Sequence, residues 1–196
     1  MIISVTNRKL CKVNFLERIE EIAKGKPHGI ILREKDLTEE EYTVLLEACN
    51  AICETYAVPL IAHTYLHAAE KLNIQCIHFS MTDFLKHQGA VETFQQVGVS
   101  IHSVEEAKQA ASLGATYLTS GHIFATNSKK GLPSRGLEFV KAVCDATTVP
   151  VFAIGGLTEE TVPLVISAGA TGICIMSELM ACQNPTESII RYHQIF

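Results

Sequence analysis

Short apolar segments alternate with amphipathic stretches along the whole chain. Eight of these segments are about four to six residues long, rich in Ile and Val, and mostly bracketed by Gly, Pro or charged residues. Segments of that length and composition predict buried β-strands. The predicted strands are residues 2–5, 29–33, 59–62, 75–79, 98–101, 116–119, 149–154 and 172–175.

Between the strands, apolar residues recur with the period of an α-helix. Residues 83–94 carry the weakest such pattern. The predicted helices are residues 15–24, 39–56, 103–114, 136–147 and 158–169.

Repeated alternation of strand and helix predicts a parallel sheet covered by helices. An open doubly wound sheet is compatible with it, but eight successive units favour a closed (β/α)₈ barrel of the TIM type. The linkers are too short to mark a boundary, so we expect one α/β domain over residues 1–196. Barrels of this class commonly have about 250 residues, which makes this a compact example. Their chemistry takes place at the carboxyl ends of the strands.

Composition excludes several classes of function. A net charge of −5 argues against a nucleic-acid partner, because such binding relies on clustered positive charge. No apolar run approaches the roughly 20 residues of a membrane span, and the N-terminus lacks a signal-peptide pattern. The seven cysteines have no zinc-site spacing and are read as reduced thiols. We therefore expect a cytoplasmic protein without a metal site.

Polar residues gather at the predicted carboxyl ends of the strands. Gly155 and Gly156 follow the seventh strand and Ser177 follows the eighth, at the commonest phosphate site of the fold. Lys129, after the sixth strand, could close over that phosphate. The other candidates at strand ends are Arg33, Lys35, His63, Ser100 and His122.

Five motifs in sequence order give the chain a resemblance to the thiamine phosphate synthase/TenI superfamily. That resemblance extends over nearly all of the chain and implies a phosphorylated small-molecule ligand and a homodimer. The motifs are IILREKDLTEEE, GVSIHSVEEA, TYLTSGHIFATNSKKG, VPVFAIGGLTEE and AGATGICIMSEL.

Departures from the synthase pattern affect its metal site. Where the synthases have Asn-Asp after the third strand, this chain has His63 and Thr64, and Ile31 and Met81 replace two glutamines. Asp83 is the carboxylate that remains. Thr64 cannot supply the negative charge that Mg²⁺ prefers, so we expect neither a metal nor another cofactor.

The histidine of Gly121-His122 replaces a proline of the synthases and is similar to the catalytic histidine of the TenI thiazole tautomerases. That similarity implies an isomerase that aromatises a carboxythiazole phosphate tautomer, with His122 as general acid and base. An imidazole suits this role because its ordinary pKa is about 6.5. Arg33 and Lys35 would bind the carboxylate, and Lys129, Gly155, Gly156 and Ser177 the phosphate.

The remaining candidates have less specific expectations. His63 is a substrate contact, a hydrogen-bonded space filler or a second acid–base, and Ser100 is a polar pocket wall. Two other functions stay open. One is a thiamine phosphate synthase, a transferase that depends on Mg²⁺, and the other is a TenI-like protein that binds a phosphorylated ligand without turning it over.

Overall fold

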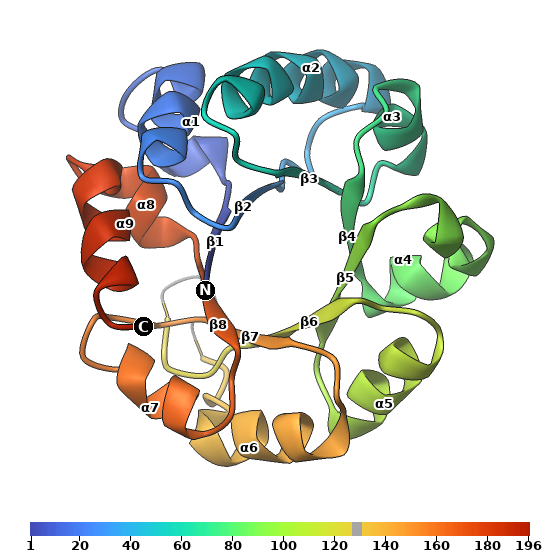
Figure 1. The fold of residues 1–196 in the computed structure, drawn as a ribbon, viewed down its shortest axis with the longest axis vertical. Coiled ribbons are helices and arrows are strands. Elements are labelled where there is room, and N and C mark those ends of the chain that lie inside the picture. The colour runs from blue at the N-terminus through green and yellow to red at the C-terminus, as the bar shows by residue number, and fades with distance from the viewer. Residues whose placement is uncertain (127–130) are drawn as a thin grey trace. The chain divides into compact units, whose positions relative to one another are not determined.

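Eight parallel strands form a closed barrel in the computed structural model, which describes residues 1–126 and 131–196. Their order in the barrel is their order in the sequence, as Figure 1 shows by colour. The predicted (β/α)₈ barrel is therefore confirmed. The strands are β1 (Ile2–Val5), β2 (Gly29–Leu32), β3 (Leu60–His63), β4 (Cys76–Ser80), β5 (Gln96–Ile101), β6 (Tyr117–Gly121), β7 (Val151–Ile154) and β8 (Gly172–Ile175).

Helices follow the strands as predicted, although the fifth predicted helix begins only at Val162. The weakly patterned stretch 83–94 holds the end of a short helix and a 3-10 helix. Within the described ranges, no helix is long and apolar enough to cross a membrane. The helices are α1 (Phe15–Lys24), α2 (Glu39–Thr55), α3 (Leu66–Lys71), α4 (Met81–Lys86), α5 (Val104–Ser112), α6 (Gly136–Ala146), α7 (Val162–Ser167), α8 (Ser177–Ala181) and α9 (Pro185–His193), with 3-10 helices η1 (Arg8–Leu10) and η2 (Gln88–Thr93).

Two strands are shorter than predicted because side-chain hydroxyls bind their flanking amides. The Arg33 N–H donates to Thr6 Oγ1 at 2.9 Å, and β2 ends at Leu32. The Val149 N–H donates to Thr147 Oγ1 at 3.1 Å, and β7 begins only at Val151. Apolar periodicity does not register such local competitors.

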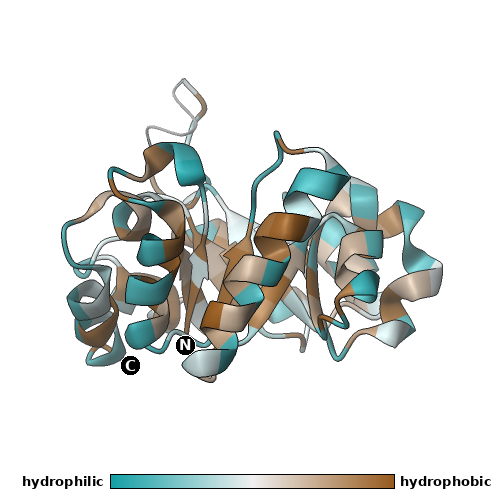
Figure 2. Cartoon of the chain, turned by 90° about the horizontal axis from the view of Figure 1, so that it is seen from above, coloured by the Kyte–Doolittle hydropathy of each residue, from teal (hydrophilic) through white to brown (hydrophobic). Residues whose placement is uncertain are grey.

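The hydrophobic core is built on the strands. Every residue of β1, β2, β3 and β8 is buried. Figure 2 shows the strands mostly in the hydrophobic colour, while the helices carry both colours. This is the distribution that amphipathic helices around an apolar sheet produce.

Backbone contacts divide the chain into two compact units, which are described separately. The first unit comprises Met1–His78, Ile175–Gln194 and Phe196. The second comprises Phe79–Cys174 and Ile195. Whether residues 1–196 act as one domain stays a prediction.

In the first unit, α2 covers strand β3. A capping box begins this helix: Thr38 Oγ1 accepts from the Glu41 N–H, and Glu41 Oε2 accepts from the Thr38 N–H. Such a box satisfies two amides that the helix itself leaves unpaired. The buried face then repeats at helical spacing through Tyr42, Leu46, Cys49 and Cys53.

Tyr42 ties the ends of two strands together. Its side chain is fully buried. The hydroxyl donates to the Leu32 carbonyl at 2.8 Å and accepts from the His63 N–H at 2.8 Å. One helix residue therefore fixes the last residues of β2 and β3, just where the candidate site begins.

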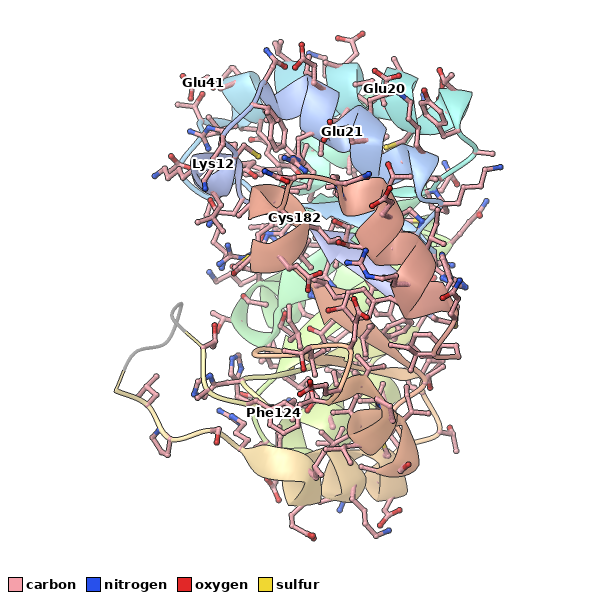
Figure 3. The ribbon with its side chains drawn as sticks, turned by 90° about the vertical axis from the view of Figure 1, so that its left-hand side faces the viewer. Lys12, Glu20, Glu21, Glu41, Phe124 and Cys182 are labelled. Atoms are coloured by element: carbon pink, nitrogen blue, oxygen red, sulfur yellow. The ribbon has the colours of Figure 1, made fainter. Side chains whose placement is uncertain are left out.

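Helix α1 packs beside α9 in the same unit. Arg18 of α1 is 2% exposed, and its Nη2 donates to the Cys182 carbonyl at 2.8 Å. Its Nη1 also lies 3.2 Å from Glu21 Oε2. Figure 3 shows α1, labelled at Glu21, beside the segment that carries Cys182. The buried Arg18 guanidinium therefore ties α1 to the segment between α8 and α9.

The second unit aligns β5, β6 and β7 in parallel register. Ser100 is level with Thr119, and Thr119 with Phe152. The Tyr117 ring meets the Phe152 ring edge-on, with centroids 5.6 Å apart. Aromatic edge contacts of this kind stabilise a strand pair beyond simple burial.

Tyr42→Phe is expected to lower the free energy of unfolding by about 1–3 kcal/mol, because the buried His63 N–H loses its acceptor. Tyr56→Phe is the matched control. Tyr56 donates to Glu20 Oε1 from a partly exposed position, where losing the bond should cost about 0.5–1 kcal/mol. Urea denaturation measures both variants. An equal loss of unfolding free energy in the two variants would show that the buried Tyr42 bridge stabilises the fold no more than an exposed hydrogen bond does.

Candidate active site

Seven of the predicted site residues lie at or beyond the carboxyl ends of their strands. Ser100 lies within β5, and Lys129 lies outside the described residues. Arg33, Lys35, His63 and Ser177 belong to the first unit, and Ser100, His122, Gly155 and Gly156 to the second.

A pair of stacked histidines lies at the ends of β3 and β4. His63 and His78 occupy paired positions on the two strands. Their ring centroids are 5.8 Å apart, and the two residues are 4% and 3% exposed. His63 Nδ1 lies 2.9 Å from Thr64 Oγ1. The sequence argument missed His78, although the alternation of β4 puts it on the same side as Ser80.

Both imidazoles are held neutral. Burial lowers the pKa of His63 well below its usual range, and the charges of His78, Lys35 and Arg33 lower that pKa further. Burial, followed by the charges of Lys35 and Arg33, lowers the pKa of His78 to about 3. The two cations are therefore close enough to act on both rings. Neutral imidazoles beside cations can hydrogen-bond to an anion without adding a further positive charge.

Thr64 has a strained backbone. Its φ is +69°, which is unusual for a β-branched residue. The Thr64 N–H donates to the His78 carbonyl at 3.0 Å, and the Tyr65 N–H donates to the His63 carbonyl at 2.9 Å. Strain of this kind persists where the surroundings over-determine a turn, often at functional sites.

Asp83, the carboxylate that remains of the family's magnesium pattern, lies in the first turn of α4, and Ser80 caps that helix. Its Oδ2 accepts from Ser80 Oγ at 2.7 Å, and its N–H donates back to Ser80 Oγ at 3.2 Å. Lys86 Nζ lies 3.4 Å from its Oδ1. In residues 1–126 and 131–196, no group of three or more His, Cys, Asp or Glu side chains could hold a metal ion. The described side chains therefore do not fit a preformed magnesium site.

In the second unit, His122 follows β6 in a left-handed conformation. Its φ is +61° and it is 6% exposed. Nε2 lies 3.0 Å from the Leu132 carbonyl. Because a carbonyl only accepts, a neutral ring carries its proton on Nε2. Nδ1 is then an acceptor, and it is buried with no hydrogen-bond partner among the described residues.

Gly155 packs directly on the backbone of His122. A Cβ at Gly155, whose φ is +107°, would lie 2.9 Å from His122 Cα. The backbone on the other side of His122 is also held, because the Arg135 N–H donates to the His122 carbonyl at 2.9 Å. This histidine is therefore fixed by its neighbours rather than solvated.

Gly156 lies against Phe124 and Ala125, in the segment that follows β6 and His122. A Cβ there would lie 2.5 Å from the Ala125 carbonyl oxygen and 2.9 Å from Phe124 Cβ. Phe124 is labelled in Figure 3. With φ at +67° as well, only glycine fits without backbone movement. The pair Gly155-Gly156 therefore lets the turn after β7 pack directly against the backbone of residues 122–125.

Ser177 and Ser100 have different surroundings. Ser177 is the first residue of α8 and is exposed. Ser100 is partly buried, and its Oγ lies 3.0 Å from Thr119 Oγ1 on the neighbouring strand. Both roles, as phosphate donor and as pocket wall, stay predictions.

Comparison with known proteins identifies a family. The sequence matches the family described as thiamine monophosphate synthase over residues 2–179. Thiamine-phosphate synthase of Clostridium acetobutylicum is 34% identical over 183 residues, covering 92% of this chain and 87% of that protein. Thiamine-phosphate synthase 2 of Streptococcus pneumoniae serotype 4 is 31% identical over 184 residues, covering 92% and 87%.

Solved structures agree on the fold. Thiamine phosphate pyrophosphorylase from Pyrococcus furiosus superposes with a TM-score of 0.84 at 21% identity, covering 99% of this chain and 94% of that one. A 3-hexulose-6-phosphate synthase superposes with a TM-score of 0.75 at 18% identity, covering both chains fully. At these identities the likeness concerns the fold alone.

These findings contradict the expected isomerase activity. The two relatives described above, at 34% and 31% identity, are named as synthases, which are transferases, so the prediction of a TenI-like thiazole tautomerase is wrong. That prediction rested mainly on His122, which stands where the synthases have a proline. A single side chain at a strand end fixes neither the substrate nor the reaction, because one fold and one residue type serve many chemistries.

His78 should make folding sensitive to acid. In the unfolded chain a histidine takes up its proton near pH 6.5, whereas in the folded protein His78 does so only near pH 3. The unfolded state therefore binds more protons between these values. The free energy of unfolding should fall as the pH falls through that window, by about 1.4 kcal/mol per pH unit for this group.

Urea denaturation between pH 7 and pH 4 measures this slope. His78→Gln should flatten it, whatever its effect on stability at pH 7. His67→Gln is the control, because the His67 side chain is 78% exposed and should leave the slope unchanged. An unchanged slope in His78→Gln would contradict the buried neutral state.

Gly156→Ala should lower the free energy of unfolding by about 2 kcal/mol or more, because positive φ and overlap with the Ala125 carbonyl act together. Gly136→Ala is the matched control. Gly136 also has positive φ, but nothing lies within 4 Å of the position that its Cβ would take, so about 1 kcal/mol is expected. Thermal and urea denaturation compare the two. Equal losses would rule out the close approach.

Proposed function

Because the chain belongs to the thiamine monophosphate synthase family, we propose that it is a thiamine-phosphate synthase, a transferase joining a pyrimidine diphosphate to a thiazole phosphate. The thiazole nitrogen supplies the electron pair for the new bond to the methylene carbon of the pyrimidine. The carbon–oxygen bond to the diphosphate breaks, and its electron pair leaves with pyrophosphate. The observation that carries the proposal is the 34% identity to a synthase over 92% of the chain.

Arg33 and Lys35 bind the diphosphate in this proposal. Their charges already lower the pKa of both buried histidines, which indicates a local positive potential at the end of β2. Cations placed in advance stabilise the charge that develops on a leaving pyrophosphate. Arg33 also offers the planar set of donors that matches phosphate oxygens. His63 adds a neutral hydrogen-bonding group nearby.

The remaining site residues serve the other parts of the substrates. Gly155 and Gly156 contact a phosphate through their backbone, and Ser177 donates its hydroxyl to a phosphate. His122 offers Nδ1 as an acceptor and so contacts a donor group of a substrate rather than a phosphate oxygen. Ser100 forms part of a pocket wall.

We also propose that the enzyme works in the cytoplasm. All seven cysteines are free thiols, as expected in a reducing compartment. Burial raises the pKa of Cys53 to about 12, and a thiol of this kind is unreactive at neutral pH. A homodimer is proposed on the family resemblance alone.

The decisive assay combines the purified chain with both substrates and Mg²⁺ and follows thiamine phosphate and pyrophosphate together. Equal amounts of the two products, each dependent on both substrates, are expected. Arg33→Gln should reduce kcat/KM at least 100-fold, about 2.7 kcal/mol of transition-state stabilisation. Lys141→Gln removes an exposed cation that pairs with Asp145 on α6 and should leave the rate unchanged.

Absence of product above the buffer rate would refute the synthase. If the wild-type chain then still bound pyrophosphate, it would be a binding protein that has kept the anion site without turnover.

A further inference from the structure

Glu34 is a buried carboxylate between the two proposed anion-binding cations. It is 3% exposed, whereas Arg33 is partly buried. An ionised carboxylate is rarely buried unless its charge and its lone pairs are matched. Its contacts therefore indicate why this side chain turns inward.

Both oxygens of Glu34 are matched by donors from the segment after β1. Oε1 accepts from Thr6 Oγ1 at 2.7 Å and from the Arg8 N–H at 3.0 Å. Oε2 accepts from Arg8 Nη1 at 3.1 Å. The charge of Arg8 compensates the buried negative charge, and removing one partner of such a pair is strongly unfavourable.

Thr6 transmits this arrangement to Arg33. A hydroxyl has one proton, and the Thr6 hydroxyl donates it in a hydrogen bond to Glu34 Oε1. The remaining lone pairs of Thr6 Oγ1 are then available to accept, and the Arg33 N–H donates to it at 2.9 Å. Thr6 is fully buried, and its own N–H donates to the Ile31 carbonyl. The chain Glu34–Thr6–Arg33 therefore sets the direction of the peptide from which the Arg33 side chain departs.

Arg8 also contacts Asp36 beyond Lys35. Its Nη1 and Nη2 lie 2.6 and 2.8 Å from the Asp36 oxygens, and Lys9 Nζ lies 2.8 Å from Asp36 Oδ2. Hydrogen bonds from Arg8 and Lys9 lower the pKa of Asp36 well below its usual range. Asp36 is exposed, so solvent screens this end of the network much more than the buried end.

We propose that Glu34 is a positioning residue for anion binding. Through Thr6 it holds the end of β2 in the conformation in which Arg33 and Lys35 bind the diphosphate of the substrate. The identity of the anion rests on the proposed synthase function. The hydrogen-bonded chain Glu34–Thr6–Arg33, called the relay below, has the same geometry whichever anion binds.

Thr6→Val and Thr6→Ser test the relay directly. Valine keeps the volume of threonine but removes the acceptor for the Arg33 N–H, whereas serine keeps the hydroxyl. Isothermal titration with inorganic pyrophosphate should give a Kd at least 10-fold higher for Thr6→Val, with recovery to within about 3-fold of wild type in Thr6→Ser. The KM for the pyrimidine diphosphate should rise in parallel, and the KM for the thiazole phosphate should not.

Asp36→Asn is the matched control, because it removes a charge from the exposed end of the same Arg8. Its Kd for pyrophosphate should stay within about 2-fold of wild type. Glu34→Gln supplies a second test of the buried end if Thr6→Val fails to fold, as judged by circular dichroism. It should also raise the Kd at least 10-fold.

A lowered melting temperature with an unchanged Kd in folded Thr6→Val or Glu34→Gln would reduce Glu34 to a purely structural role and overturn the proposal. Failure of the wild-type chain to bind pyrophosphate would overturn it too. A wild-type chain that binds pyrophosphate but forms no thiamine phosphate would refute the synthase, and the variants would still decide the role of Glu34.

Discussion

Buried backbone groups that leave the barrel at the end of a strand must find new partners, because water does not reach them. In the first unit two side-chain hydroxyls supply these partners. Tyr42 bridges the Leu32 carbonyl and the His63 N–H, and Thr6 accepts from the Arg33 N–H. The starting points of the Arg33 and His63 side chains are thus fixed by buried hydroxyls from elsewhere in the unit. The candidate chemistry depends on these contacts before any substrate group is considered.

The charges of the first unit follow from this framework. Glu34 lies next to two cations in sequence, yet its contacts are directed to Thr6 and Arg8. Burial lowers the pKa of both histidines, and the charges of Arg33 and Lys35 lower these pKa values further. A neutral, desolvated pair of histidines beside two cations favours the binding of an anion, because the negative charge is attracted to both cations. The charge of the buried Glu34 is thus matched by Arg8, which comes from the segment after β1.

The order and type of the elements could be predicted from sequence because apolar runs of fixed length report burial directly. The ends of β2 and β7 could not, since they depend on hydroxyls of Thr6 and Thr147 that periodicity ignores. Arg33, His63 and His122 could be named as candidates because polar residues at strand ends stand out. Glu34 received no role of its own because a charged residue between two charges is typical of a surface. His78 was missed because a histidine within a strand is typical of a core. The proposed reaction rests on relatedness over the whole chain. The identity of one substituted residue, His122, was not enough to assign it.

His122 shows how much of a role the local structure does define. The Leu132 carbonyl can only accept, so a neutral ring donates from Nε2 and presents a lone pair at Nδ1. A lone pair repels phosphate oxygens, which separates this histidine from the anion-binding groups. Nδ1 has no hydrogen-bond partner in residues 1–126 and 131–196. Leaving a buried acceptor unpaired is costly, so a ligand group that donates there gains more than it would in water. The proposed contact of this imidazole with a donor group of a substrate follows from that preference, and its burial and fixed backbone need no proton transfer to a thiazole ring.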